Sequence, residues 1–151
     1  GRPGPGGDVF WSRYADAPNE ALYPFGYGLS YTSFEYSDLE LAQSTLPLGE
    51  PVAVTVQLTN SGAYAGSEVV QLYIRDRVAS TIRPLKELKG FQKVSLAAGE
   101  TQQLRFILGP DELGFYSGDG RFQIEPGNFD VFVGGSSVDT LQASFEWLEV
   151  E

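Results

Sequence analysis

The chain contains no cysteine and no histidine among its 151 residues. Without cysteine it can form no disulfide and offers no thiolate, so the sequence says nothing about the redox compartment. Without histidine it lacks the side chain that serves most often as a general base and as a metal ligand. We therefore expect no metal site, no cofactor and no nucleophilic triad in this chain.

Positive charge is also scarce. The chain has 10 lysines and arginines against 20 aspartates and glutamates, which gives a net charge of −10. Nucleic-acid binding needs a basic face, and anionic membrane surfaces attract basic segments. No apolar run approaches the length needed to span a bilayer. We therefore expect neither nucleic acid nor a membrane among the partners.

The chain has no methionine and begins at Gly1, without a signal peptide. Since a translated gene product normally starts with methionine, we expect a piece of a longer protein. The hydrophobic share of 42% and the charged share of 20% are those of an ordinary globular domain. The aromatic share of 13% is high and favours β-structure.

Residues 1–33 show no regular alternation and are expected to form an irregular linker. The segment opens with GRPGPGG, a loop composition, and closes with LYPFGYGLSYT over residues 22–32. Proline and glycine constrain the closing stretch, while its tyrosines and phenylalanine need a surface to pack on. From the residues alone, two interpretations stay open: a fitted joint between packed bodies, or a loop folded onto the core of its own domain.

From Phe34 onward the sequence alternates as β-strands do, with turn signals between short apolar runs. We predict one domain over residues 34–151, an all-β antiparallel sandwich of the immunoglobulin or fibronectin type III kind, with about seven strands and no helix. A bulge is expected near Ser37-Asp38 and an irregularity at Gly90. The residues predicted to be nearly fully buried are Val54, Val56, Leu72, Ile74, Phe106, Phe129 and Val131.

Three pairs of acids could in principle serve glycoside hydrolysis, which usually needs two facing carboxylates. The pairs are Asp38 with Glu40, Asp111 with Glu112 in a turn after Pro110, and Glu146 with Glu149. No pocket-forming pattern surrounds any of them. A solvated acidic surface is the better interpretation, and we predict no catalytic residue in this chain.

Long ordered motifs nevertheless resemble a known family. LYPFGYGLSYT, LTNSGAYAGSEVVQLYIRD, RPLKELKGFQKVSLAAGE and EPGNFDVFVGGSS resemble the C-terminal fibronectin type III-like domain of family 3 glycoside hydrolases and the segment that leads into it. SRYADAPNEALYPFGYG looks like the periplasmic bacterial β-glucosidases among them. The resemblance implies a periplasmic or secreted location. It also implies a parent enzyme whose nucleophile and acid/base lie on a barrel and an α/β domain outside this chain.

The resemblance implies that the linker aromatics contact those two catalytic domains. Aromatics beside arginine, as in Trp11, Arg13 and Tyr14, are typical of protein interfaces and also of sugar contacts, and we favour the interface. Arg83, with Lys86 and Lys89, either forms a solvated strand edge or docks on a neighbouring domain. The residues predicted for a domain interface are Trp11, Arg13, Tyr14, Tyr23, Phe25, Tyr27, Tyr31 and Arg83.

Two functions of different classes remain. The first is a non-catalytic module that braces the catalytic domains of a β-glucosidase or β-xylosidase, with a homodimer as an arrangement that the resemblance allows. The second is an independent carbohydrate-binding or adhesion module. A binding module should carry a flat row of exposed aromatics on a strand face, whereas most aromatics here alternate as core residues or lie in the linker. The sequence therefore favours bracing.

Overall fold

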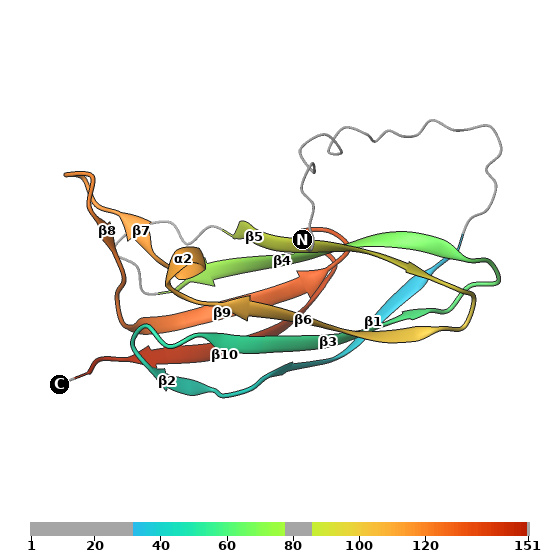
Figure 1. Ribbon diagram of the computed structural model, residues 1–151, viewed down its shortest axis with the longest axis horizontal. Helices are drawn as coiled ribbons and strands as arrows, with labels where there is room; N and C mark the ends of the chain where they lie inside the picture. Colours follow the sequence, from blue (N-terminus) through green and yellow to red (C-terminus); the bar gives the residue numbers. More distant parts are fainter. Residues whose placement is uncertain (1–31, 78–85, 151) are drawn as a thin grey trace.

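The computed structural model describes residues 32–77 and 86–150 of the chain. Ten strands and one short helix, α2, lie within these residues (Figure 1). The elements are β1 (Phe34–Leu41), β2 (Thr45–Pro47), β3 (Val52–Asn60), β4 (Gly66–Asp76), β5 (Glu87–Leu96), β6 (Thr101–Leu108), α2 (Pro110–Leu113), β7 (Phe115–Tyr116), β8 (Phe122–Gln123), β9 (Gly127–Gly134) and β10 (Thr140–Leu148).

Two sheets pack face to face. A three-stranded sheet has the order β1-β3-β6, and a five-stranded sheet has the order β2-β10-β9-β4-β5. The predicted all-β sandwich of the fibronectin type III kind is confirmed. Every pair of strands is antiparallel except β2 and β10, which run parallel. That parallel pair departs from the antiparallel pairing predicted from the sequence.

The parallel pair arises because the chain changes sheets just after β1. Ala42 N–H still donates to Ala53 O on β3 at 2.9 Å, whereas Glu146 N–H on β10 donates to Ser44 O at 2.9 Å. The chain therefore keeps its direction while it crosses from one sheet to the edge of the other. A strand that continues in this way lies parallel to β10 without a hairpin.

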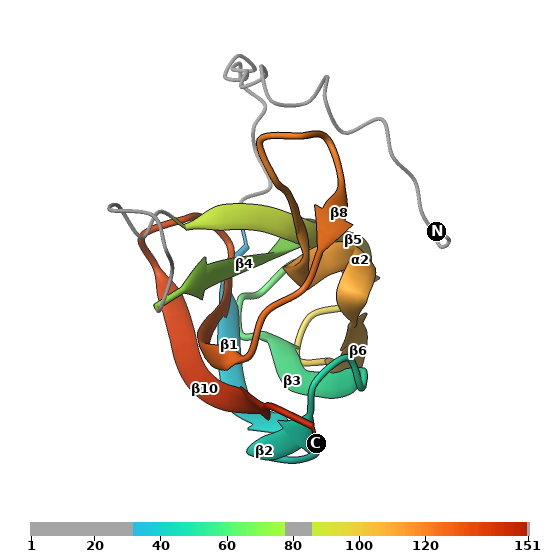
Figure 2. The same cartoon turned by 90° about the vertical axis from the view of Figure 1, so that its left-hand side faces the viewer.

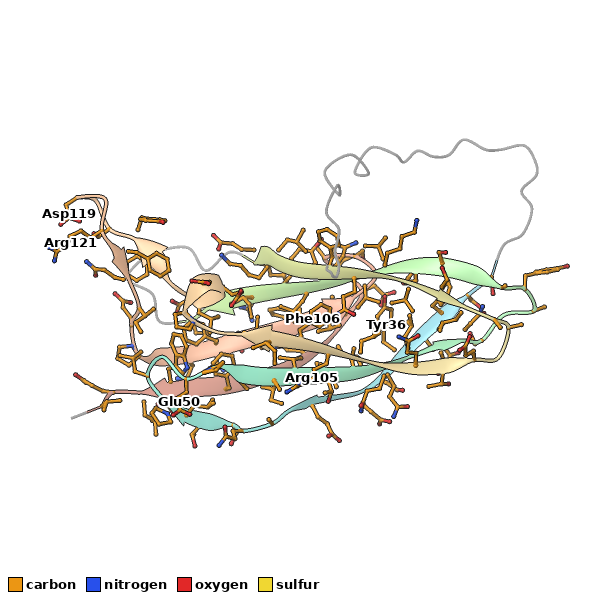
Figure 3. The ribbon with its side chains drawn as sticks, in the orientation of Figure 1. Tyr36, Glu50, Arg105, Phe106, Asp119 and Arg121 are labelled. Atoms are coloured by element: carbon orange, nitrogen blue, oxygen red, sulfur yellow. The ribbon has the colours of Figure 1, made fainter. Side chains whose placement is uncertain are left out.

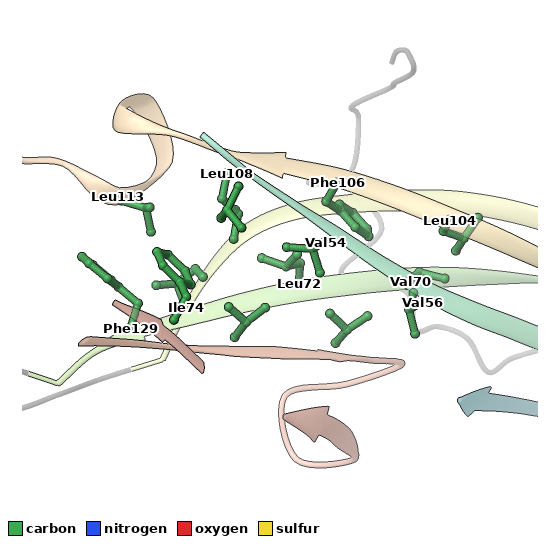
Figure 4. Close-up of a cluster of buried hydrophobic side chains, with 14 of the residues drawn as sticks. Val54, Val56, Val70, Leu72, Ile74, Leu104, Phe106, Leu108, Leu113 and Phe129 are labelled. Atoms are coloured by element: carbon green, nitrogen blue, oxygen red, sulfur yellow. The ribbon is translucent and has the colours of Figure 1, made fainter. Parts of the chain in front are cut away.

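The core lies between the two sheets, and every residue predicted to be buried is buried (Figure 4). Alternate residues of β3, from Val52 to Asn60, face this core, as period-two patterning requires. One end of the core is aromatic. The Phe129 ring stacks on the Phe145 ring with 5.2 Å between the ring centroids, and it meets the Trp147 ring edge-on with 5.5 Å between the centroids. Burying each large side chain contributes about 1.5–3 kcal/mol, so this alternation supplies most of the driving force for the fold.

Both predicted strand irregularities are present. The register between β1 and β3 shifts between Ser37 and Glu40, and Asp38 has a positive φ of 53°. In the pairing of β4 with β5, Leu72 lies opposite Gly90 and Tyr73 lies opposite Leu88. Lys89 is therefore the extra residue of that bulge.

The prediction that the chain has no helix, with Asp111-Glu112 in a turn, is wrong. These residues form α2, a single turn that begins at Pro110. Proline is favoured in the first helical turn, and the Glu112 carboxylate accepts a hydrogen bond from Gly109 N–H at 2.7 Å. Leu113, 7% exposed, anchors the turn in the core. One turn is too short to show helical periodicity in a sequence.

A small hairpin follows α2. Strands β7 and β8 pair with each other and form a sheet separate from the two main ones. The hairpin projects from one end of the sandwich (Figures 1 and 2). In the described part of the chain, no helix is long and apolar enough to cross a membrane.

Candidate functional site

The eight residues predicted to form a domain interface all lie outside the residues that the structure describes. They are Trp11, Arg13, Tyr14, Tyr23, Phe25, Tyr27, Tyr31 and Arg83. Their roles stay predictions. The described residues nevertheless form three groups of interacting polar or aromatic side chains. These are the hydrogen bonds of Asn60 beside Thr32, a charged cluster on the outer face of the five-stranded sheet, and a half-buried tyrosine–glutamate pair.

Asn60 ties the first described residues to the sandwich. It is fully buried at the end of β3. Its side-chain oxygen accepts hydrogen bonds from the Thr32 hydroxyl at 2.6 Å and from Gly62 N–H at 3.0 Å. Its amide donates to Tyr64 O at 2.8 Å and to Leu96 O at 3.1 Å. All four hydrogen-bonding positions of the side chain are thus used, which fixes the chain as it joins β1.

Gly62 belongs to the same junction because Thr32 packs directly on it. A Cβ added at Gly62 would lie only 2.2 Å from the Thr32 hydroxyl oxygen, so no larger residue fits without moving residue 32. An open hollow of about 440 Å³ adjoins this point and is lined by Thr32, Ser33, Gly62, Ala63 and Tyr64. These lining residues include no carboxylate, and the arrangement suits packing rather than acid/base chemistry.

Asp130 on β9 is the centre of a charged cluster on the outer face of the five-stranded sheet. It is 1% exposed. Arg75 donates to its Oδ2 from Nε and Nη2 at 3.1 and 2.9 Å, and Arg77 approaches its Oδ1 at 3.2 Å. Ser144 donates to Oδ1 at 2.9 Å from β10. Strands β4, β9 and β10 are therefore tied together across their outer face by one carboxylate.

The pKa of Asp130 reflects two opposing causes. Burial acts to raise it, while hydrogen bonds from Ser144, Arg75 and Arg77 lower it. The hydrogen bonds outweigh burial, and the pKa of the carboxyl lies below its ordinary value. Asp130 is thus held as a charged structural carboxylate. It does not have the raised pKa that a general acid would need.

Phe132, two residues further along β9, is covered on the same outer face. It is only 4% exposed. The Arg75 guanidinium carbon lies over its ring at 5.1 Å from the centroid, and the Lys86 ammonium lies over it at 4.2 Å. Lys86 also donates to Ser137 O at 2.7 Å. Two cations placed in this way shield the ring from water and stabilise it through cation–π attraction.

Tyr36 and Glu68 form a half-buried pair that joins β1 to β4. The Tyr36 hydroxyl donates to Glu68 Oε2 at 2.7 Å. Burial, and then the nearby Glu68, raise the pKa of the Tyr36 hydroxyl, so it stays protonated. Burial raises the pKa of Glu68, which the hydrogen bond from Tyr36 opposes. This pair links the two sheets, and Figure 3 shows Tyr36 on the strand that it anchors.

None of the candidate acids from the sequence lines the hollow beside Thr32. Asp38, Glu40, Asp111 and Glu149 are exposed, and the Glu112 carboxylate caps the backbone of α2. Among the described residues, no three histidines, cysteines, aspartates or glutamates cluster closely enough to hold a metal ion. Of these acids, Glu112 has a structural role, because its carboxylate caps α2.

Asp130 and Phe132 were not predicted from the sequence as residues of a site. Alternation places both on the outer side of β9, which usually means exposure to solvent. A phenylalanine among outward positions, with the alternating Arg75 and Arg77 elsewhere in the chain, was the available signal. The register that brings these strands together was not accessible from one sequence, because the partners lie more than 50 residues apart.

Comparisons with known proteins agree with this fold. The fibronectin type III-like domain family matches residues 68–137. The chain is 43% identical over 139 residues to a periplasmic β-glucosidase of Salmonella typhimurium, covering 92% of this chain and 18% of that protein. It is 45% identical over 125 residues to a putative β-xylosidase of Formosa agariphila, covering 83% of this chain and 16% of that protein.

A solved structure gives the same picture. The β-glucosidase of Listeria innocua in complex with gluconolactone superposes with a TM-score of 0.73 at 43% identity, over 96% of this chain and 20% of that one. The chain thus spans about a fifth or less of the relatives named here. The chain thus carries a fibronectin type III-like domain, and its matches fit the C-terminal domain of family 3 glycoside hydrolases of the β-glucosidase and β-xylosidase kind.

Proposed function

We propose that this chain is a non-catalytic module that braces the catalytic domains of a larger glycoside hydrolase. The main support is that the buried polar side chains of the sandwich hold its segments together. Asn60 and Asp130 each use their side chains to tie two or more segments together. Such satisfied polar networks rigidify a fold, and the side chains that form them are committed to holding its segments together.

The parent reaction would be hydrolysis of a terminal non-reducing β-glycoside, with the reacting carboxylates on the barrel and α/β domains. The support is that the relatives are named as β-glucosidases and a β-xylosidase and that this chain matches only a small part of each. A periplasmic or secreted location follows the same reasoning, from the name of the Salmonella relative. We infer no preference between glucosides and xylosides, because those contacts belong to other domains.

An independent carbohydrate-binding module is the competing function, and the described aromatics speak against it. A sugar platform needs coplanar exposed rings. The exposed aromatic residues in the described ranges are Tyr64, Tyr116 and Phe122, and the last two meet at an interplanar angle of 64°. Rings at that angle form a ridge rather than a flat row, which favours contact with protein over stacking along a polysaccharide.

The test is to delete residues 32–151 from the full-length enzyme and to measure its thermal inactivation with an aryl β-glucoside and an aryl β-xyloside. We expect the surviving activity at low temperature to show an unchanged KM, while the half-life on heating shortens by roughly tenfold or more, because interdomain contacts contribute kinetic stability. A truncated enzyme as long-lived as the intact one would contradict bracing. Hydrolysis by the isolated chain would contradict the non-catalytic assignment.

A further inference from the structure

The β7–β8 hairpin, residues 115–123, carries the most exposed pair of aromatic side chains in the described part of the chain. Tyr116 is 72% exposed and Phe122 is 43% exposed, and their ring centroids lie 5.1 Å apart. The two strands pair only with each other among the described elements. These rings therefore contribute little to the core of the sandwich, and their exposure needs another explanation.

The hairpin is built to hold the rings in place. Its turn is closed by hydrogen bonds from Ser117 N–H to Arg121 O and from Gly120 N–H to Ser117 O, both at 2.9 Å. Asp119 accepts from the Ser117 hydroxyl and from Arg121 N–H, and Gly120 has the positive φ of 87° that the turn requires. A turn with this many internal bonds presents its side chains without paying a large ordering cost on contact.

The base of the hairpin is equally fixed. Leu113, 7% exposed, holds the preceding turn in the core, and Ile124 packs against the core on the other side. Gly114 leaves room for the Phe122 ring, because a Cβ at that position would come within 2.4 Å of the ring. The aromatic pair is thus seated on a rigid stem that projects from the end of the sandwich (Figure 3, at Asp119 and Arg121).

We propose that this hairpin is a docking contact between the module and the remaining part of the parent polypeptide; the proposal rests on the bracing function above. An exposed tyrosine in contact with a second aromatic ring, with Arg121 next to that ring in the chain, has the composition of an interface anchor. About four-fifths of the Listeria enzyme lies outside the region that this chain covers, so a large covalently attached surface is available to receive it.

The size of the patch selects that occupant over a second copy of the chain. Two aromatic side chains bury at most about 500 Å² on their own side of a contact, whereas a standard interface between separate molecules buries about 800 Å² on each partner. A tethered domain needs far less, since its effective concentration is already high. The 64° angle between the rings disfavours stacking on a sugar chain.

The experiment uses the full-length enzyme with a single cysteine added at the hairpin tip. Gly118 is suitable because nothing lies within 4 Å of a Cβ placed there, and the chain has no cysteine of its own. Gly118→Cys is compared with Val138→Cys, on a loop whose valine is 86% exposed. Maleimide labelling at each position is followed by peptide mass spectrometry, with denatured protein as the reference for intrinsic reactivity.

We expect the thiol at position 118 to react about tenfold more slowly than the thiol at position 138 in the native enzyme. Adding Tyr116→Ser and Phe122→Ser should bring its rate up to that at 138. Equal rates in the native enzyme would overturn the proposal. So would protection that disappears on dilution, which identifies a second copy, or protection that appears only with cellopentaose, which identifies a sugar.

Labelling at position 118 tests the hairpin contact, and inactivation of the truncated enzyme tests bracing, so either proposal can fail without the other. If deletion of residues 32–151 destabilises the enzyme while position 118 reacts freely, bracing stands and this hairpin is not the contact. If position 118 is protected while the deletion has no effect on inactivation, the hairpin docks and bracing is wrong.

Discussion

The outer faces of the two sheets differ sharply. The three-stranded sheet presents mainly threonine, glutamine and arginine to solvent, as Thr55, Gln103 and Arg105 illustrate, and its one large apolar residue on β6, Ile107, is 50% exposed. The five-stranded sheet instead buries a carboxylate and a phenylalanine on its outer side, Asp130 at 1% and Phe132 at 4% exposure.

The difference shows what alternation can and cannot predict. Period-two patterning tells which residues leave the core, and it does so correctly for both sheets. The same patterning does not tell whether other side chains cover these outward-facing residues. On the five-stranded sheet, Arg75 and Lys86 cover Phe132, and Arg75 and Arg77 cover Asp130.

The strongest test of this contrast replaces one large apolar residue on each outer face. We expect Phe132→Ala to lower the free energy of unfolding by about 2–4 kcal/mol, because a covered ring is lost and a cavity remains. Ile107→Ala, on the exposed face, should lower the free energy of unfolding by no more than about 0.5 kcal/mol. Urea denaturation of both variants measures the two values. Similar losses for both would mean that the faces do not differ energetically.

The charged cluster should be the next most sensitive feature. Asp130→Asn keeps the shape but removes both ion pairs with arginine, and we expect a loss of about 1–3 kcal/mol. The arginines are partly exposed, at 33% and 50% for their side chains, so water can solvate them and limit the cost. Glu40, an exposed carboxylate on β1, provides the control. Glu40→Gln should change the midpoint of the unfolding transition little. A loss no larger than that of the control would show that the cluster is not a stabilising unit.

Asp130 and Glu68 should also give opposite dependences of stability on pH. Because its pKa is lowered in the folded state, Asp130 stabilises the fold at pH values above the ordinary carboxyl pKa of about 4. This stabilisation is lost as the pH falls through the lowered pKa. The raised pKa of Glu68 contributes stability at acid pH, and this is lost as the pH rises from about 4 through the raised pKa. Asp130→Asn should flatten the acid limb of the unfolding curve, and Glu68→Gln should remove the decline above it. The same change of slope in both variants would contradict the assignment.

The smallest effect is expected from the cation that covers Phe132. Lys86→Gln removes an ammonium 4.2 Å from the ring centroid and its hydrogen bond to Ser137 O, and should cost about 0.5–1 kcal/mol. Lys93→Gln, on an exposed part of β5, serves as the control. If Phe132→Leu abolishes the difference between the two lysine variants, the interaction with the ring is the cause. If the difference persists, the hydrogen bond to Ser137 accounts for it.

Much of the fold could be predicted from the sequence. The alternation of Val54, Val56, Leu72 and Phe106 identified the core, and the phase shift near Ser37 identified the bulge. Helix α2 could not be identified in this way, because four residues hold only one turn and its cap depends on a single contact of Glu112. The parallel pairing of β2 depends on a change of sheet that leaves no period in the sequence.

The candidate site was less accessible. The structural role of Asp130 can be recognised only when β4 and β10 are placed beside β9, because its partners are distant in sequence. The contact between Tyr116 and Phe122 depends on the turn between them, which alternation of apolar residues does not reveal. The predicted interface aromatics before Thr32 lie outside the described residues, and their contacts stay predictions.

If the sandwich holds the catalytic domains together, as we propose, then destabilising its core must shorten the lifetime of the enzyme's activity on heating. Phe129 is 2% exposed and stacks on Phe145, so Phe129→Ala should cost about 3–5 kcal/mol in the free energy of unfolding of the sandwich. In the full-length enzyme, we expect this variant to keep its kcat at low temperature and to lose β-glycosidase activity on heating at least roughly tenfold faster than the wild type. An unchanged rate of inactivation, with the sandwich unfolded, would contradict the account.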